Sequence, residues 1–231
     1  MSFVEVKNLD YKKGGKKIFS NLNFSLDRGR IIALLGENGS GKTTIMRLLS
    51  GLALNWKGQM TIDGLPINHG TKSKVSYLVD LNDFPKDFTI EKVLSFYHQF
   101  YEDFSLERAA ELLDFMELEK KMKLKVLSLG QKGKVSLAVA LARKTAVYLL
   151  DEPLNGIDLL TRERIIQSLL RWFEEDSLIL ITTHQLAEIE TIVDEVLILK
   201  NREIVLHQEL ESLRETREIG LEELYREELA K

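Results

Sequence analysis

A glycine-rich segment that ends in lysine and threonine constrains this chain more than any other feature. The segment follows the apolar run of residues 31–35, precedes the amphipathic stretch of residues 44–52, and consists of Gly36, Glu37, Asn38, Gly39, Ser40, Gly41, Lys42 and Thr43. The spacing G-x-x-x-x-G-K-[ST] between a strand and a helix is typical of a phosphate-binding loop. A flexible turn is the alternative, but the flanking strand and helix patterns argue against it. The chain is therefore predicted to bind a nucleoside triphosphate.

The residue types in this loop suggest individual contacts with the ligand. Backbone N–H groups of the run from Gly36 to Thr44 are expected to surround the phosphates, helped by the positive end of the following helix. Lys42 should reach the β- and γ-phosphates, and Thr43 should hold Mg²⁺. ATP and Mg²⁺ are therefore the expected ligands.

Composition narrows the class of protein. The 231 residues, of which 44% are hydrophobic, suit one large domain or a domain with an inserted lobe. Lysine and arginine number 32 against 36 acidic residues, a net charge of −4, so there is no general positive field to attract nucleic acid. With no cysteine there is no disulfide framework and no thiolate metal site. We expect no nucleic-acid partner.

Apolar segments in the chain are short. The runs of residues 31–35 and 146–150 are far below the ~20 residues that span a bilayer, and the N-terminus alternates like a strand and lacks the apolar core of a signal peptide. If the protein serves a membrane, another chain must span it. The expected location is cytoplasmic, with peripheral attachment to the cytoplasmic face of the membrane through that second chain.

Hydrophobic periodicity predicts an α/β organisation. Strand patterns cover residues 3–6, 16–19, 24–26, 31–35, 59–62, 75–79, 146–150, 178–181 and 196–199. Helical patterns cover residues 89–142, 162–173 and the charged tail from residue 208 to residue 231. We expect one domain over residues 1–231, in which residues 1–82 and 145–231 form a core with an antiparallel β part and residues 83–144 form an inserted helical subdomain.

Two adjacent carboxylates close one of the predicted buried strands. Asp151 and Glu152 directly follow the apolar run 146–150. Hydrolysis of a nucleotide needs an acidic group for Mg²⁺ and a base for the attacking water, and we assign these roles to Asp151 and Glu152 respectively. A solvated strand end would also place carboxylates here, but the phosphate-binding loop upstream favours the catalytic interpretation.

A five-residue segment between the loop and the carboxylates resembles a known family motif. Leu127-Ser128-Leu129-Gly130-Gln131 resembles LSGGQ, the signature sequence of the ABC ATPases, with Leu129 in place of the first glycine. Ser128 and Gln131 also form an S-x-x-Q capping box, which would stabilise a helix start without any ligand. The two roles can coexist, because a capped helix N-terminus still offers N–H groups to an anion.

Three further positions extend the resemblance over nearly the whole chain. Asn155-Gly156-Ile157-Asp158 looks like the D-loop of the family, and His184 looks like its switch histidine. Tyr11 stands where the family stacks an aromatic ring on adenine, although packing on the sheet edge is the alternative for this residue.

Membership of this family would imply both a fold and a mechanism. The implied fold is a P-loop ABC ATPase with a mixed sheet core, an antiparallel β subdomain and a helical signature subdomain. The implied mechanism is head-to-tail closure of two ATPase subunits, identical or different. Each ATP would lie between Lys42, Asp151 and Glu152 of one subunit and Ser128 and Gly130 of the other. Contacts from Gln131 and Asp158 are also expected, and Glu152, His184 and Lys42 are the expected catalytic residues.

One position departs from the family pattern. After the predicted strand 75–79, ABC ATPases usually carry a glutamine that touches Mg²⁺ or the attacking water, and Asp80 stands there. A carboxylate would add attraction to Mg²⁺ and repulsion toward the γ-phosphate. We expect Asp80 to approach the metal in the closed dimer; the alternative is that it points to solvent.

Two functions follow from the resemblance. The first is the ATP-hydrolysing subunit of an ABC transporter, which drives export through a separate transmembrane permease subunit and does not bind the transported substrate itself. The second is a soluble ABC ATPase that acts on nucleic acid or a metallocluster assembly complex. A groove that receives a helix of the permease is expected on the helical subdomain, at Phe84, Phe88, Phe96, Tyr97 and Phe100.

Overall fold

Two β-sheets organise the molecule, and the computed structural model describes residues 2–217 and 219–231. The larger sheet has six strands in the order β10-β9-β3-β8-β7-β6. Its strands are β3 (Arg30–Gly36), β6 (Val75–Tyr77), β7 (Val147–Asp151), β8 (Leu178–Thr182), β9 (Glu195–Lys200) and β10 (Glu203–Glu209). All pairings are parallel except that of β10 with β9, so the sheet is mixed. This confirms the predicted mixed core.

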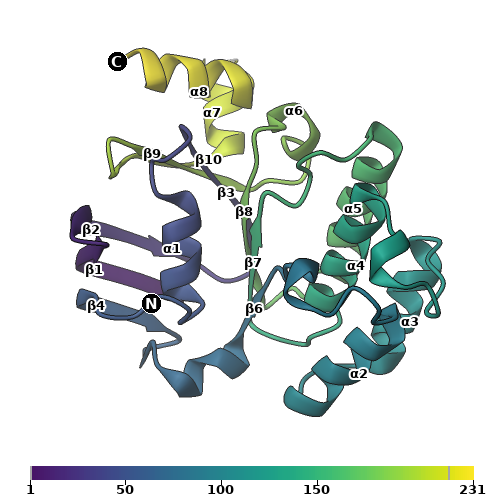
Figure 1. Ribbon diagram of the computed structural model, residues 1–231. Helices are drawn as coiled ribbons and strands as arrows, with labels where there is room; N and C mark the ends of the chain where they lie inside the picture. The colour runs from purple at the N-terminus through teal and green to yellow at the C-terminus, as the bar shows by residue number, and fades with distance from the viewer. Residues whose placement is uncertain (1, 218) are drawn as a thin grey trace.

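A smaller antiparallel sheet covers one side of the larger one (Figure 1). Its order is β2-β1-β4-β5, with strands β1 (Val4–Lys13), β2 (Lys16–Leu26), β4 (Lys57–Ile62) and β5 (Leu65–Pro66). Helix α1 (Lys42–Leu49) lies between the two sheets, and its buried residues join the same apolar cluster as β1 and β2. The antiparallel part predicted from the N-terminal alternation is thereby confirmed.

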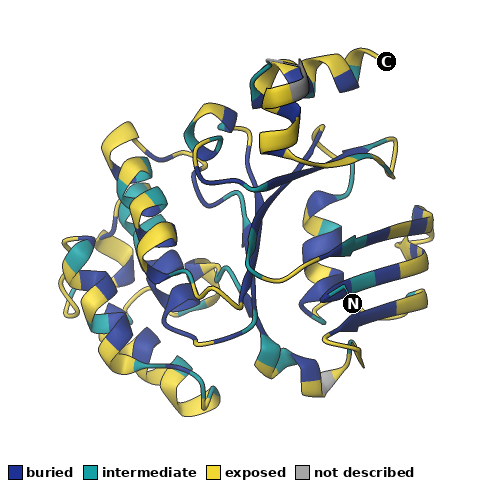
Figure 2. Cartoon of the chain, turned by 180° about the vertical axis from the view of Figure 1, so that it is seen from behind, coloured by how far each residue is buried: buried dark blue, intermediate teal, exposed yellow. Residues whose placement is uncertain are grey.

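Strand β3 is buried on both faces, because it separates the two apolar cores. Ile32 and Leu34 pack on the side of α1 and the antiparallel sheet, whereas Ile31, Ala33 and Leu35 pack on the opposite side. A strand with two buried faces reads as a continuous apolar run rather than an alternating one. Figure 2 shows this central sheet as a dark blue, buried layer.

Helices cover the opposite face of the large sheet and extend beyond it. They are α2 (Ile90–Phe100), α3 (Leu106–Phe115), α4 (Leu129–Leu141), α5 (Leu159–Trp172), α6 (Leu186–Ile189), α7 (Leu210–Arg217) and α8 (Leu221–Ala230). Three 3₁₀ helices lie in connecting segments: η1 (His69–Lys74) between β5 and β6, η2 (Leu81–Asp83) between β6 and α2, and η3 (Leu124–Val126) between α3 and α4. The side chains of Thr89, Ser105, Ser128 and Asp158 cap the starts of α2 to α5. In the described part of the chain, no helix is long and apolar enough to cross a bilayer.

Some predicted boundaries differ from the structure. The predicted strands 16–19 and 24–26 belong to one strand, β2, and the strand predicted over residues 75–79 ends at Tyr77. Strand β10 lies partly inside the tail that we predicted to be helical from residue 208. It is an edge strand with mostly exposed residues, so it lacks the apolar signal by which the inner strands were found.

Candidate functional site

The loop after β3 has a backbone that glycine alone accommodates at two positions. Gly36 has φ +156° and a Cβ there would lie 2.4 Å from the carbonyl oxygen of Leu199; Gly41 has φ +120° and a Cβ there would lie 2.6 Å from Cζ of Phe19. Both distances are shorter than real Cβ contacts, and both φ values lie in the region that favours glycine. The loop therefore wraps tightly between β9 and β2 at the carboxyl end of β3.

The start of α1 is suited to an anion. Its N-cap is Gly41, which supplies no side-chain hydrogen bond, and the first turn contains no acidic residue. The first N–H groups of the helix are thus left for a ligand, at the positive end of the helix dipole. Oγ of Ser40 is buried and has no hydrogen-bond partner among the described residues. An orphaned donor beside free N–H groups is what a bound phosphate chain would satisfy.

The ammonium group of Lys42 lies inside this loop. Its Nζ donates to the carbonyl oxygens of Gly36 at 2.6 Å and Glu37 at 3.1 Å. Burial lowers the pKa of Lys42, and the negative charges of Glu152 and Asp151 raise it again. The loop therefore holds a cation in the field of the two carboxylates at the end of β7.

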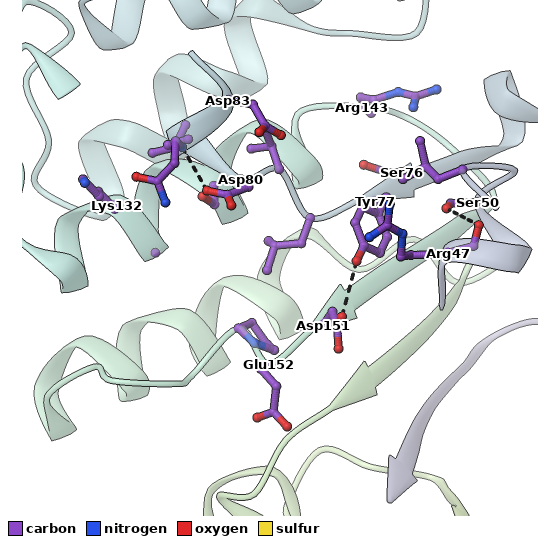
Figure 3. Close-up of a pocket in the computed structure, with 18 of the residues that line it drawn as sticks. Arg47, Ser50, Ser76, Tyr77, Asp80, Asp83, Lys132, Arg143, Asp151 and Glu152 are labelled. Carbon is purple, nitrogen blue, oxygen red and sulfur yellow. Dashed lines mark hydrogen bonds between the residues drawn. The ribbon is translucent and has the colours of Figure 1, made fainter. Parts of the chain in front are cut away.

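Asp151 is fixed by the strands on both sides of β7. Thr182 on β8 donates from Oγ1 to Oδ1 of Asp151 at 2.8 Å, and the Tyr77 hydroxyl on β6 donates to Oδ2 at 3.3 Å. Figure 3 shows the Tyr77 hydroxyl directed at Asp151. Burial, followed by the charge of Asp151, raises the pKa of Tyr77 to about 12, so the phenol keeps its proton at neutral pH.

Tyr77 and Thr182 are site residues that no local sequence pattern marks. The available signal was topological: parallel strands end at the same edge of a sheet, so the last residues of β6 and β8 had to flank Asp151. Thr182 is the register partner of Asp151 in the β7–β8 pair.

Glu152 has a strained backbone, and its side chain lies against that of His184. Its φ is +51°, which is rare for a residue other than glycine. The N–H of Glu152 donates to two oxygens of Thr182, the carbonyl oxygen at 3.1 Å and Oγ1 at 2.9 Å. Oε1 is buried and lacks a well-formed hydrogen bond among the described residues, yet Nε2 of His184 lies only 3.1 Å away. The two predicted catalytic side chains are thus in contact.

Asp80 lies in the same open cavity of ≈ 770 Å³ as Asp151 and Glu152 but has a structural role of its own. It is the N-cap of η2, where its Oδ1 accepts from the N–H of Asn82 at 2.9 Å. Figure 3 shows it in the part of the cavity lined by Asp83 and Lys132, apart from Asp151. Its approach to a metal stays a prediction.

The signature segment begins helix α4 and packs on the D-loop segment. The predicted capping box is confirmed: N–H of Gln131 donates to Oγ of Ser128 at 3.2 Å, and N–H of Ser128 donates to Oε1 of Gln131 at 2.9 Å. Leu129 is 61% exposed, but its side chain contacts Gly156. A Cβ on Gly156 would lie 2.5 Å from Cδ2 of Leu129. A Cβ on Gly130 would lie 3.3 Å from Oδ2 of Asp158.

Asp158 and the signature segment form a unit separate from the phosphate-binding loop. Asp158 caps α5 by accepting from the N–H of Thr161 at 3.1 Å, which lowers the pKa of Asp158. Within the part of the chain that the structure describes, no hydrogen bond or ion pair joins Ser128, Gly130 or Gln131 to residues 36–44.

Tyr11 lies beside the loop, but its ring is mostly covered. It faces Phe19 across the β1–β2 pair, and Phe19 supports Gly41 of the loop. Only 8% of Tyr11 is exposed. Stacking on adenine would therefore require the ring to move or to use its remaining edge, and this role also stays a prediction.

Metal binding by this site would depend on the nucleotide. Among the described residues there is no group of three or more His, Cys, Asp or Glu side chains that could hold an ion alone. Mg²⁺ commonly binds through one or two carboxylates together with substrate phosphates. Asp151 and the hydroxyl of Thr43, next to Lys42, fit such a ligand set.

Comparison with known proteins identifies relatives along most of the chain. The ABC transporter family model matches residues 19–155. The ABC transporter ATP-binding protein YtrB of Bacillus subtilis is 31% identical over 215 residues, covering 92% of this chain and 74% of the relative. The Nod factor export ATP-binding protein I of Burkholderia orbicola is 33% identical over 205 residues, covering 85% of this chain and 67% of the relative.

Solved structures agree with these relatives. The structure of an ATP-binding subunit of an ABC transporter superposes with a TM-score of 0.87 at 27% identity and covers 100% of both chains. A dimeric ATP-binding cassette in a post-hydrolysis state, bound to ADP and Pi, superposes with a TM-score of 0.77 at 25% identity, covering 90% of this chain and 98% of that one.

Proposed function

The chain belongs to the ABC transporter family as an ATP-binding subunit with ATPase activity, and from this premise we propose that it dimerises on ATP to drive export through separate membrane subunits. The observation that carries the proposal is the meeting of three elements at one edge of the sheet. The phosphate-binding loop, the Asp151–Glu152 pair and His184 all follow carboxyl ends of parallel strands.

The loop of residues 36–44 and the nearby Tyr11 would bind the nucleotide. Backbone N–H groups from Gly36 to Thr44, the orphaned Oγ of Ser40 and the ammonium of Lys42 would hold the phosphates. Lys42 would turn from the loop carbonyls toward the β- and γ-phosphates when the nucleotide enters. Tyr11 would provide the ring beside adenine.

Glu152 would act as the general base in hydrolysis, with its side chain positioned by His184. Glu152 would take a proton from the attacking water, and His184, 3.1 Å away, would keep its side chain oriented. Asp151 and Thr43 would hold Mg²⁺, which supplies positive charge to the phosphates during the reaction. Asp80 would join this set only after closure, because in the isolated chain it caps η2.

The second half of each ATP site would come from a partner ATPase subunit, identical or different. Ser128, Gly130 and Gln131 at the start of α4, with Asp158 beside them, would contact the γ-phosphate held by the partner's loop. The described residues show no polar contact between them and residues 36–44 of the same chain, which supports this arrangement, and so does the dimeric state of the similar ADP-bound and Pi-bound cassette. ATP would then join two subunits, and hydrolysis would release them.

An aromatic cluster on the helical part offers a surface for the membrane subunit. The rings of Phe84, Phe96 and Phe100 form a contiguous series, with centroids 5.4 Å apart for Phe84–Phe96 and 4.6 Å for Phe96–Phe100. Phe100 is 63% exposed. Aromatic anchors of this kind carry much of the energy when a helix docks in a groove. We place the permease here, on the proposed helical subdomain of residues 83–144 between the core parts 1–82 and 145–231.

The proposed direction and location follow from the permease. The name of the Burkholderia relative describes export, which supports export for this chain. The subunit would lie at the cytoplasmic face of the membrane, held there by the permease. The transported substrate would contact the permease and not this chain.

The test is transport by the reassembled complex. The tagged chain is purified with its membrane partner, the complex is placed in vesicles with the ATPase outside, and ATP-dependent accumulation of substrate inside the vesicles is measured. Export predicts accumulation.

The docking site is tested with two variants. Phe100→Asp should abolish accumulation and co-purification while ATP binding persists, whereas Leu170→Asp, at an exposed leucine on α5, should leave both unchanged. Co-purification of the Phe100 variant would place the permease elsewhere, and release of preloaded substrate would indicate import.

A further inference from the structure

One arginine on α5 joins the D-loop segment to the segment that carries His184. We propose that Arg162 is a positioning residue for hydrolysis, because its guanidinium fixes the backbone from which the His184 side chain reaches Glu152. The inference deepens the proposed function and rests on the role given there to His184. Arg162 itself belongs to none of the sequence motifs described above.

The contact between His184 and Glu152 depends on where the histidine backbone is held. Nε2 of His184 lies 3.1 Å from Oε1 of Glu152, yet 44% of the histidine side chain is exposed. A side chain with this exposure is held in place mainly by its backbone. Position matters at such a site, because a displacement of about 1 Å can lower the rate about 100-fold.

The helix that follows His184 is too short to fix its own position. Helix α6 contains four residues, whereas isolated helices shorter than ~12 residues are marginal in water. Its N-cap, Gln185, makes no capping hydrogen bond with its side chain. Leu186 and Ile189 are buried in the core, but the polar side of α6 needs a contact with another element.

Arg162 supplies this contact from α5. Its Nη1 donates to Oε1 of Gln185 at 2.9 Å and to Oε1 of Glu188 at 2.8 Å. Gln185 is the residue next to His184, and Glu188 lies in the first turn of α6. The arginine and glutamate side chains are 21% and 22% exposed, so water and salt screen the ion pair only partly. The planar guanidinium also holds its acceptors at fixed angles, which an ammonium group cannot do.

The guanidinium is also attached to the D-loop segment. Nε of Arg162 donates to the carbonyl oxygen of Ile157 at 2.8 Å. Ile157 is buried and packs against α4, where a Cβ on Gly133 would lie 2.5 Å from Cδ1 of Ile157. The D-loop segment is therefore well anchored, and Arg162 holds α6 at a set distance from it.

Loss of the guanidinium would release α6 from the D-loop segment. Oε2 of Glu188 is already buried without a hydrogen-bond partner, so without Arg162 neither carboxylate oxygen would have one among the described residues. The carboxylate would then move toward water and shift α6 together with His184. These hydrogen bonds of Arg162 involve residues 157, 185 and 188 and not the loop of residues 36–44. The effect is therefore expected on the rate of hydrolysis and not on ATP binding.

The experiment compares Arg162→Gln with Arg164→Gln in the full chain. Arg164 lies on the same helix and also donates to a carbonyl oxygen and a carboxylate, those of Phe115 at 3.1 Å and Glu117 at 2.7 Å. The kcat and the KM for ATP are measured, with the melting temperature as a check on folding. Arg162→Gln should lower kcat about five- to twentyfold with KM within about twofold, whereas Arg164→Gln should keep the wild-type kcat.

Three further measurements show whether Arg162 acts through His184. In the His184→Gln background, Arg162→Gln should lower kcat by less than about twofold, because the group that it positions is already gone. Nuclear magnetic resonance of the imidazole Cε1–Hε1 groups of the four histidines should show a shifted His184 signal in Arg162→Gln and unchanged signals in Arg164→Gln. Glu188→Gln, which weakens the same ion pair with less disturbance of the fold, should lower kcat about threefold.

Three results would overturn the inference. The first is an unchanged kcat in both Arg162→Gln and Glu188→Gln. The second is an equal loss of kcat from Arg162→Gln with and without His184, which would show a structural effect only. The third is a raised KM at unchanged kcat, which would place Arg162 in ATP binding.

His184→Gln alone separates this inference from the proposed function. If His184→Gln hydrolyses ATP like the wild type, the proposed role of His184 fails and the inference fails with it. If His184→Gln loses activity while Arg162→Gln does not, only the Arg162 inference is refuted.

Discussion

Single residues at the edge of the large sheet act through charge and hydrogen bonds. Lys42 is the clearest case, because its ammonium already lies among carbonyl oxygens and close to two carboxylates. Lys42→Ala should weaken ATP binding about 10- to 100-fold, the range for hydrogen bonds to charged groups. A fluorescence titration with an ATP analogue measures this, with Lys144→Ala at an exposed position as the control. Equal affinities for the two variants would contradict the loop assignment.

Asp80 tests whether a carboxylate can replace an amide near the metal. If Asp80 approaches Mg²⁺ on closure, Asp80→Gln should raise the Mg²⁺ concentration for half-maximal hydrolysis about fivefold, the scale of ~1 kcal/mol between partly screened charges. Asp80→Asn can keep the cap of η2 while removing the charge, so it should behave like the glutamine variant. Asp83→Asn is the control. Superimposed Mg²⁺ titrations for the wild type and both Asp80 variants would rule out the contact.

At the scale of elements, the β9–β10 hairpin carries a pH-dependent contribution to stability. Nε2 of His207 lies 2.8 Å from Oε2 of Glu195, and Nε of Arg30 lies 3.6 Å from Oε1 of Glu195. The hydrogen bond to His207 is the largest cause of the lowered pKa of Glu195, although burial opposes it. A carboxyl with a lowered pKa in the folded state stabilises the protein above its unfolded pKa, and this stabilisation is lost as the pH falls through the folded value.

Glu195→Gln should therefore lower the free energy of unfolding by about 1 kcal/mol at pH 7. The difference from the wild type should shrink as the pH falls below about 4, where the unfolded carboxyl takes up a proton first and the folded carboxyl follows at lower pH. Urea unfolding at both pH values measures the difference, and Glu203→Gln on the exposed start of β10 is the control. If the difference in unfolding free energy between Glu195→Gln and the wild type does not change with pH, the lost stability comes from packing and not from the charge of Glu195.

Elements also differ in how far they could be predicted. The loop, the carboxylate pair and the capping box of α4 are local patterns, and the structure places all three at element ends as expected. Strand β10 was missed because an exposed edge strand carries a weak apolar signal. Tyr77 carries no local sequence signal, because its contact joins segments far apart in the chain and only the order of the strands brings it to Asp151.

At the scale of the whole molecule, the proposed function predicts an ATP site that is shared with a partner subunit. Glu152→Gln should leave ATP binding intact and lower hydrolysis by about 10²-fold or more, because the general base is lost. The uncleaved nucleotide should then hold two subunits together, so size-exclusion chromatography with ATP and Mg²⁺ should detect a dimer. Glu163→Gln on the exposed side of α5 should retain the wild-type activity. A monomer alone would count against a site shared by identical subunits.

The order of strands in the large sheet has a consequence for synthesis on the ribosome. Among the described residues, strand β3 pairs with β8 and β9, which leave the ribosome more than a hundred positions later. Until then the two edges of β3 have no neighbouring strands in the nascent chain, and such exposed edges are prone to aggregate. Pairing between distant segments also slows folding. Newly made copies of this protein should therefore depend on chaperones until their last third has been translated.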